Sequence, residues 1–336
     1  MNLVTGATGL LGSHVLIELC RKGQQTRALF RDEQKKQQVF DLFTYYFNDE
    51  AIVKWKLIEW QAADLLDITA IDQATKNIHT IYHCAAKVSF FKADFEACIQ
   101  HNRHVTAHLV DFALKHGVAL FCHVSSTAAI GASGSSIVTE ESKWDVTTKH
   151  SGYGISKYLA EKEVWRGVEE GLQAVVVNPC VILGPAIDSS PSMQLIRTAK
   201  NGLRFYPSGT NSVVDVRDVA LAMVSLCASS IRNERFLVVG AQLSFKDLMS
   251  QLSSAFHQKA PHLKAPRKLT LLLGMLNELK GHITGHRSGL SIETARSAYQ
   301  SMQYSTNKIE TALSFQFRPL SDTIENVLNG SDFLTK

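Results

Sequence analysis

The sequence predicts a doubly wound α/β fold, in which helices cover both faces of a parallel sheet, with a smaller, mainly helical C-terminal lobe. Short apolar runs alternate with longer segments of helical periodicity, and this alternation is typical of a parallel sheet. The first run also breaks into a turn with glycines at 6, 9 and 12, after which a helical pattern begins. We expect residues 1–185, with returning segments near 210–240, to form the sheet domain. Residues 186–206 and 244–336 should form most of the lobe.

The composition is that of an ordinary globular chain, with 336 residues, 45% hydrophobic and 20% charged. The net charge of +4 is small and no Lys/Arg block exceeds three residues, so neither a nucleic acid nor an anionic membrane surface is implied. Six cysteines without a C-x-x-C pair predict reduced thiols. The first strand begins at residue 2, and no apolar run reaches the ~20 residues of a membrane span. We therefore expect a cytoplasmic protein with no cleavable leader and no membrane span.

The expected elements follow one another in a regular order. After the first strand and helix we expect a second strand at 25–30, a helix at 32–47, a third strand near 53–59, a fourth strand at 80–84, a helix at about 95–115, a fifth strand at 118–124 and a helix at 151–170. Ligands of open parallel sheets bind at the carboxyl ends of the strands, so the residues that follow each strand are the candidate site residues.

The turn after the first strand predicts a phosphate site. Gly6, Gly9 and Gly12 lie where a buried strand meets a helix N-terminus. A backbone without side chains lets a pyrophosphate approach closely, and the free N–H groups of the helix end favour its negative charge. By itself this pattern also fits a plain strand-to-helix turn.

An arginine ends the second strand, at the point that faces the adenosine ribose in dinucleotide-binding folds. An acid there would bind the 2′-hydroxyl of NAD, whereas Arg31, with help from Arg27, Lys35 or Lys36, would pair with the 2′-phosphate of NADP. The alternative is that these are solvated charges on a loop. We predict NADP(H) in preference to NAD(H).

Three polar residues later in the chain predict proton-transfer chemistry. Tyr153 and Lys157 are four residues apart on a predicted helix, so they project from one face. A nearby ammonium lowers the pKa of a phenol, and Ser126 at the end of the fifth strand would orient a substrate oxygen. Alone, the Tyr-x-x-x-Lys pair occurs by chance on many helix faces.

The order and spacing of these motifs resemble the extended short-chain dehydrogenase/reductase superfamily, the NAD(P)-dependent epimerase/dehydratase family, over nearly the whole chain. The resemblance implies a Rossmann-type fold, a homodimer packed through the helices at 95–115 and 151–170, and no metal. Ser126, Tyr153 and Lys157 would be catalytic. The implied cofactor-binding residues are Gly6, Thr8, Gly9, Leu10, Leu11 and Gly12 at the turn, Arg31 at the ribose, Asp64 and Leu65 at the adenine, Ala85, Ala86 and Lys87 on the ribose side, and Tyr153, Lys157, Pro179 and Val181 at the nicotinamide.

Two branches of the superfamily fit unequally. Nucleotide-sugar epimerases and dehydratases usually have an acid in place of Arg31 and an arginine for the substrate diphosphate where this chain has Asn211. The segments 26–32, 305–308 and 317–320 resemble the dihydroflavonol-4-reductase-like branch instead.

We therefore expect an NADP(H)-dependent oxidoreductase that reduces a small, fairly apolar aldehyde or ketone, or oxidises the matching alcohol. One alternative is an NAD-dependent nucleotide-sugar epimerase or dehydratase. Another is a dinucleotide-sensing protein without catalysis, which the presence of Ser126, Tyr153 and Lys157 together disfavours.

Substrate specificity should lie at 186–206 and 244–304, where Ser244 is a good N-cap for a helix at 245–256 and a further helix is expected from 266 toward 280. We interpret the apolar run 269–276 as a lid over an apolar pocket or as core; the alternative is a membrane-lying face, as in the similar 3β-hydroxysteroid dehydrogenases. Solvated helix ends or contacts to an acidic substrate would account for the basic residues around it, which are Arg267, Lys268, Lys280, His282, His286 and Arg287.

The helix at 95–115 carries a histidine pattern and an asparagine of interest. His101, His104 and His108 fall at i, i+3 and i+7, which invites a metal hypothesis, although packing or solvent exposure fits better because no cysteine or carboxylate signature accompanies them. Asn102 matches the family's structural asparagine, which we expect to bond to backbone near the active site.

Overall fold

The computed structural model describes residues 1–131, 137–185, 191–284 and 289–334. Its largest feature is a sheet of seven strands in the order β10-β6-β5-β4-β1-β2-β3, and all neighbouring strands are parallel. The strands are β1 (Asn2–Thr5), β2 (Thr26–Phe30), β3 (Ile58–Ala62), β4 (Thr80–His83), β5 (Leu120–Val124), β6 (Ala174–Pro179) and β10 (Glu234–Val238). The strand order reverses between β1 and β4, which makes the carboxyl ends of these two strands the expected ligand crevice. The predicted doubly wound, Rossmann-type fold is confirmed.

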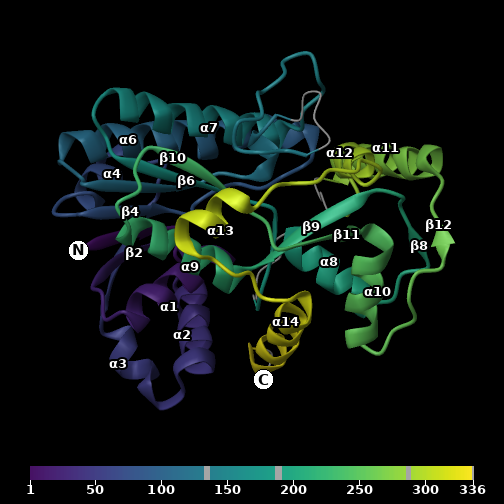
Figure 1. The fold of residues 1–336 in the computed structure, drawn as a ribbon, viewed down its shortest axis with the longest axis horizontal. Helices are drawn as coiled ribbons and strands as arrows, with labels where there is room; N and C mark the ends of the chain where they lie inside the picture. Colours follow the sequence, from purple (N-terminus) through teal and green to yellow (C-terminus); the bar gives the residue numbers. More distant parts are fainter. Residues whose placement is uncertain (132–136, 186–190, 285–288, 335–336) are drawn as a thin grey trace.

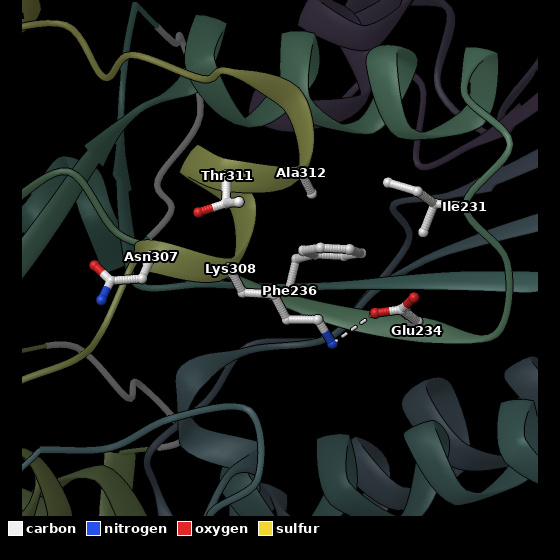
Figure 2. A pocket seen from close by; sticks show the side chains of 7 residues that line it. All are labelled: Ile231, Glu234, Phe236, Asn307, Lys308, Thr311 and Ala312. Atoms are coloured by element: carbon white, nitrogen blue, oxygen red, sulfur yellow. Dashed lines mark ion pairs between the residues drawn. The ribbon is translucent and has the colours of Figure 1, made fainter.

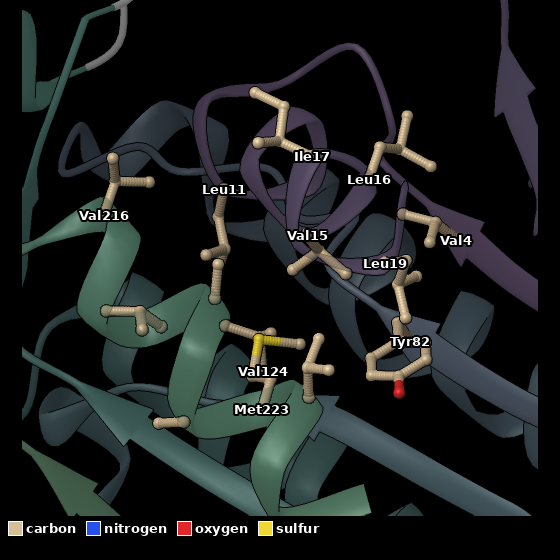
Figure 3. Close-up of a cluster of buried hydrophobic side chains, with 14 of the residues drawn as sticks. Val4, Leu11, Val15, Leu16, Ile17, Leu19, Tyr82, Val124, Val216 and Met223 are labelled. Carbon is tan, nitrogen blue, oxygen red and sulfur yellow. The ribbon is translucent and has the colours of Figure 1, made fainter. Parts of the chain in front are cut away.

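Helices cover both faces of this sheet (Figure 1). One face is covered by α1 (Leu10–Arg21), α2 (Glu33–Phe47) and α9 (Val216–Ala228). The other is covered by α4 (Ile68–Ala74), α6 (Val105–Lys115) and α7 (Gly152–Glu169). Figure 3 shows Leu11, Val15 and Leu19 of α1 beside Val216 and Met223 of α9. Burial of these side chains fixes α1, and with it the turn that precedes it, against the sheet.

The expected third strand near 53–59 is wrong at its start. Ala51–Trp55 forms the short helix α3 after a 3-10 turn, η1 (Asn48–Glu50), and β3 begins only at Ile58. The Trp55 ring packs on Phe43 of α2 with a centroid distance of 5.2 Å, while Val53 faces solvent. The apolar run therefore folds as a helix that packs back on α2. The contact between Trp55 and Phe43 outweighs the strand propensity of Val53.

The long helix expected at 95–115 is present but interrupted. A turn, η2 (Lys92–Asp94), leads into α5 (Phe95–Cys98), then a π-helical segment, η3 (Ile99–His104), and then α6. The wider π turn changes the i, i+3 register that would align His101 with His104. Among the described residues, no three His, Cys, Asp or Glu side chains form a group that could hold a metal ion.

The C-terminal lobe is mainly helical, as predicted. A second sheet has the order β11-β9-β7. Its strands are β7 (Val181–Leu183), β9 (Thr210–Asp215) and β11 (Ala241–Ser244). Around it pack α8 (Pro191–Lys200), α10 (Phe245–Ala255) and α14 (Leu320–Leu334). The cap of α10 is confirmed, because the Ser244 side chain accepts from Asp247 N–H.

The remaining elements follow β5 or belong to the second half of the chain. They are the 3-10 turn η4 (Thr127–Ala129), the strand pair β8 (Phe205–Tyr206) and β12 (Leu263–Lys264), and the helices α11 (Arg267–Thr284), α12 (Ile292–Ser297) and α13 (Asn307–Leu313). The apolar run at 269–276 lies on α11, where most of its large side chains are exposed, so its interpretation as core is wrong. No helix in the described ranges is both long and apolar enough to cross a bilayer.

Candidate active site

The turn between β1 and α1 is shaped for close approach by a ligand. Gly6 has φ +66°, and a Cβ there would lie 2.7 Å from the backbone nitrogen of Ala85. A Cβ on Gly12 would overlap the Gly6 carbonyl, so side chains are excluded at both positions. Gly9 caps α1 without any side-chain hydrogen bond, which leaves the first N–H groups of the helix available to an anion.

The loop after β4 lies against this turn and is held by one amide side chain. Asn102 Oδ1 accepts from Lys87 N–H at 2.8 Å, and its Nδ2 donates to the Lys87 carbonyl at 3.0 Å and to Ser156 Oγ at 2.8 Å. The expectation that Asn102 bonds to backbone in this region is therefore confirmed. The Asn102 side chain ties the segment that contains Ala85 and Ala86 to helix α7.

At the far end of the same edge, Arg31 and Asp64 lie side by side. Their side chains are 3.7 Å apart, and each is more than half exposed. Asp64 also accepts from the N–H of Leu66, which shapes the loop after β3. Arg31 therefore projects into solvent at the carboxyl end of β2, where a 2′-phosphate would be bound.

The other cations considered for this phosphate are differently placed. Arg27 lies on the strand and bonds to Glu59 and to the carbonyls of Ala74 and Lys76, so its guanidinium is already used to join β2 to the end of α4. Lys36 pairs with Glu33 at 2.6 Å.

Two hydroxyl groups meet at the carboxyl end of β5. Ser126 caps the turn η4, and its carbonyl accepts from Asn178 Nδ2 at 3.1 Å. Tyr153 is the second residue of α7, which begins there because Ser151 caps it through Gly154 N–H. Burial raises the pKa of the Tyr153 phenol to about 12, and a hydrogen bond with Ser126 opposes this shift. The phenol is therefore protonated at neutral pH.

Lys157 lies one turn along α7 and is buried. Its Nζ donates to the Val124 carbonyl at 2.6 Å, beside the end of β5. Burial lowers the pKa of the ammonium to about 8, and Glu161 opposes this shift. The expected lowering of the phenol pKa by Lys157 is not seen, because the groups that act on Tyr153 are its burial, Ser126 and Cys98.

A buried hydrogen-bond chain that the sequence did not predict runs beneath these residues. Thr5 Oγ1 bonds His83 Nδ1 at 2.7 Å, and His83 Nε2 bonds Thr106 Oγ1 at 3.0 Å. Thr106 donates to the Asn102 carbonyl, and Asn102 reaches Ser156. The chain links the strand that precedes Gly6 to the helix that carries Tyr153.

A second buried cluster holds the backbone of Ser126. The Glu161 carboxylate accepts from Ser125 Oγ at 2.7 Å, Asn178 Nδ2 at 3.0 Å and Arg235 at 3.0 Å. Because Asn178 also donates to Ser126, this carboxylate fixes β5, β6 and β10 relative to α7. Pro179 and Val181 follow Asn178 directly, at the end of β6 and the start of β7.

A surface pocket between β10 and α13 lies away from this edge. Phe236, Lys308 and Glu234 are among the residues that line it, and Figure 2 shows the ion pair of Lys308 with Glu234, whose charged atoms are 2.9 Å apart. Glu234 is the first residue of β10, at the amino end of the strand. The pocket therefore has no part in the candidate active site.

Comparison with known proteins agrees with this geometry. The model of the NAD dependent epimerase/dehydratase family matches residues 2–240. The chain belongs to this family. As a member of the extended short-chain dehydrogenase/reductase superfamily, it is an enzyme of the NAD(P)-dependent oxidoreductase/epimerase type.

Several curated family members match most of the chain. A Synechocystis protein provisionally named dihydroflavonol 4-reductase is 28% identical over 312 residues, which are 91% of this chain and 87% of that protein. Sterol demethylase protein B of Methylococcus capsulatus is 28% identical over 281 residues, 82% of this chain and 80% of its own. Cinnamoyl-CoA reductase 1 of Petunia hybrida is 25% identical over 266 residues, which are 75% of this chain and 76% of that protein.

Solved structures share the fold over nearly the whole chain. The crystal structure of gox2253 superposes with a TM-score of 0.79 at 26% identity and covers 98% of this chain and 96% of its own. The UDP-glucuronic acid 4-epimerase of Bacillus cereus was solved with UDP-glucuronic acid and NAD. It superposes with a TM-score of 0.74 at 18% identity and covers 99% of this chain and 98% of its own. At that identity the epimerase shows the shared fold alone.

Some site features had no signal in the sequence. His83, Thr106 and Glu161 take part in the buried chains, yet His83 lies 78 residues from Thr5 and 23 from Thr106, and Glu161 lies 17 residues from Asn178. Only the alignment of strands in the sheet brings them together. His286 and Arg287, considered for an acidic substrate, lie outside the described residues, as does the stretch 186–190 of the expected specificity region.

Proposed function

We propose that this family member is an NADP(H)-dependent enzyme that reduces a small, apolar aldehyde or ketone, or catalyses oxidation of the matching alcohol. Its catalytic residues would be Ser126, Tyr153 and Lys157. The observation that carries the proposal is the position of Ser126 at the end of β5 together with Tyr153 and Lys157 in the first turns of α7, where Lys157 Nζ donates to the Val124 carbonyl. Their strand and helix lie on the same edge as the glycine turn, where the switch point of a doubly wound sheet binds ligands.

The turn fits a dinucleotide because glycines at positions 6 and 12 let the backbone close tightly against Ala85 and leave the N-terminus of α1 without side chains over it. Thr8, Leu10 and Leu11 would present backbone N–H groups to it, whereas the Gly9 N–H donates to the Gly6 carbonyl at 3.0 Å and closes the turn. The remaining cofactor contacts would come from Arg31, Asp64, Leu65, Ala85, Ala86, Lys87, Pro179 and Val181. The bound nicotinamide supplies or accepts the hydride.

The residues of the chain would then handle the proton. With its pKa raised to about 12, Tyr153 is a protonated phenol that can give its hydrogen to a substrate oxygen. Ser126 would donate a hydrogen bond to the same oxygen. Lys157, held at the Val124 carbonyl, would return a proton to the phenol between turnovers.

Two observations favour an apolar carbonyl compound over a nucleotide sugar. Phe90 packs edge-on against the Tyr153 ring with a centroid distance of 5.5 Å, and Phe95 lies against Gly152 at the start of α7. The position at which epimerases tend to carry a diphosphate-binding arginine is Asn211, on β9. An amide cannot replace the paired charge of a guanidinium.

The preference for NADP(H) depends on Arg31, whose side chain is exposed and pairs, among the residues that the structure describes, with the Asp64 carboxylate alone, at 3.7 Å. We expect NADPH to bind more tightly than NADH. Arg31→Ala should lose at least tenfold in NADPH affinity, because a charge-assisted pair is removed, and change NADH affinity little. The control is Arg21→Ala, which removes an exposed arginine at the C-terminal end of α1, away from the glycine turn.

The test is nucleotide fluorescence on binding, followed by a panel of aldehydes and ketones with the preferred nucleotide. Tighter binding of NADH, or retention of NAD through purification together with turnover of a uridine diphosphate sugar, would contradict the proposal in favour of an epimerase. Binding of either nucleotide without turnover of any carbonyl compound would favour a dinucleotide-sensing protein.

The family resemblance supports one further part of the proposal, a homodimer packed through α6 and α7. The six cysteines, all free thiols in the structure, support another, a cytoplasmic location. Light scattering coupled to gel filtration tests the dimer, for which twice the mass of the chain is expected.

A further inference from the structure

Helix α11 carries a continuous apolar stripe on its outer side. Its large apolar side chains are between 50% and 77% exposed, and these are Leu269, Leu272, Leu273, Met275, Leu276, Leu279 and Ile283. Most of them recur at intervals of three and four residues, so they share one side of the helix. Globular proteins rarely expose apolar surface of this extent unless the surface binds something.

The opposite side of the helix fixes this orientation. Gly274 packs against the backbone of Ser291, and a Cβ there would lie 3.0 Å from its carbonyl oxygen. Glu278 accepts from Ile292 N–H at 2.9 Å, and Asn277 Nδ2 donates to the Leu290 carbonyl at 2.9 Å. Polar and small residues therefore attach α11 to the start of α12, and the exposed leucines lie on the other side of α11. Figure 1 shows the two helices side by side.

Basic residues flank the stripe. At 100° per residue, Lys268 and Lys280 fall just inside its two edges, and Arg267 and His282 are also exposed. Glu278, the single acid of the helix sequence, faces α12. None of the four cations forms an ion pair within the ranges that the structure describes.

The strand pair β8 and β12 also exposes apolar and basic side chains next to the helix. Phe205 and Leu263 are paired across β8 and β12 and are 50% and 43% exposed. Arg204 and Lys264, their sequence neighbours, are exposed as well. Apolar and basic residues thus continue from β12 into α11, although the net charge of the whole chain did not indicate such a surface.

We propose that the α11 stripe docks on the surface of an anionic lipid bilayer. The leucines would enter the boundary between headgroups and acyl chains, and Lys268 and Lys280 would lie at the level of the phosphates, which is the arrangement of an interfacial amphipathic helix. At 18 residues with flanking charges, the helix lies on the membrane and does not cross it.

Charge selects the bilayer over a second copy of the chain. A symmetric contact through the stripe would bring Lys268 and Lys280 of one molecule close to those of the other, and α11 offers no outward-facing acid to pair with them. An anionic lipid surface supplies the missing negative charge to every cation at once.

The docking surface is connected to the candidate active site through α12. Glu293 of α12 accepts from Gly152 N–H at 3.1 Å and 3.2 Å, at the first residue of the helix that carries Tyr153. If the proposed reductase function holds, the substrate is a carbonyl compound that partitions into the bilayer. The docking itself does not depend on that function.

The test is sedimentation of the full chain with vesicles of phosphatidylcholine alone and vesicles that also contain phosphatidylserine, at low and high salt. We expect binding to the anionic vesicles, weakened by salt. Leu276→Gln/Leu279→Gln should lower the partition coefficient at least tenfold, because two exposed leucines no longer enter the bilayer. Lys268→Gln/Lys280→Gln should lower it by about fivefold for each lysine.

The matched control is Ile52→Gln/Val53→Gln, which changes an equally exposed apolar pair on α3 and should bind as the wild type does. Tyr153→Phe should also bind normally, which separates failure of docking from failure of the proposed reaction. The proposal is overturned if the wild type does not bind anionic vesicles, or if the leucine variant binds them as well as the wild type. A dimer that the leucine variant abolishes, without vesicle binding, would assign the stripe to a second copy.

Discussion

At the scale of single residues, the ionisation states of Tyr153 and Lys157 define the candidate site. Burial keeps the phenol protonated and lowers the pKa of the lysine from 10.5 to about 8. A shift of this size costs about 3 kcal/mol of stability at neutral pH, because the charged form is less favourable in the folded chain. Stability is rarely given up for a buried charge outside a functional site. The sequence predicted both residues from their spacing, but their environments depend on Val124 and Ser126, whose proximity requires the sheet.

The pKa of Lys157 predicts how the proposed reaction responds to pH. The ammonium loses its proton as pH rises through about 8, so the rate constant kcat/KM for carbonyl reduction should fall above that pH. Lys157→Arg keeps the charge and should show a lower rate without the fall. Lys162→Arg, on the exposed side of the same helix, should behave as the wild type. A wild-type profile that stays level to pH 10 would show that the charge of Lys157 has no part in the reaction.

At the scale of elements, hydrogen bonds between neighbouring segments hold the candidate site together. Asn102 joins the loop after β4 to α7, and His83 joins β1 to α6 through Thr5 and Thr106. The sequence predicted most strands and helices, because periodicity and caps are local. It failed at β3, where packing of Trp55 on α2 decides the conformation, and it missed the exposure of α11, which depends on where α12 lies.

The Asn102 clamp gives a prediction about stability and binding together. Asn102→Ala removes three hydrogen bonds in a buried setting and should lower the free energy of unfolding by about 2 kcal/mol. It should also weaken NADPH binding, because the Ala85–Lys87 loop loses its anchor. Gln100→Ala, an exposed position on the same π-helical segment, is the control. Urea unfolding and nucleotide titration measure both effects, and unchanged nucleotide affinity in Asn102→Ala would contradict the assigned role of the clamp.

At the scale of the whole molecule, several buried histidines are held neutral inside the sheet domain. Burial lowers the pKa of His14 to about 4 and that of His83 to about 3, from an ordinary value of 6.5, and it lowers the pKa of His123 as well. Each is uncharged in the folded chain and gains a proton on unfolding below pH 6.5. Their contribution to stability is therefore complete above that pH and is lost as the pH falls toward the folded values.

We predict an early loss of stability in acid. His14 and His83 should each lower the free energy of unfolding at pH 5 by about 2 kcal/mol relative to its value at neutral pH. His14→Gln, which removes one of these groups, should reduce the difference between the free energies of unfolding at pH 7 and pH 5 by about that amount. Urea titrations at the two pH values measure it. An equal difference in the variant and the wild type would show that His14 does not titrate on unfolding.

The central claim is that the Tyr153 phenol gives its proton to a carbonyl oxygen beside a bound nicotinamide. The most direct test is a single-turnover measurement of NADPH oxidation with an accepted carbonyl compound, comparing the wild type with Tyr153→Phe. Loss of a positioned acid should slow turnover by about 10² to 10⁴, while NADPH affinity stays within about twofold because the glycine turn is untouched. Turnover by Tyr153→Phe at the wild-type rate would contradict the account.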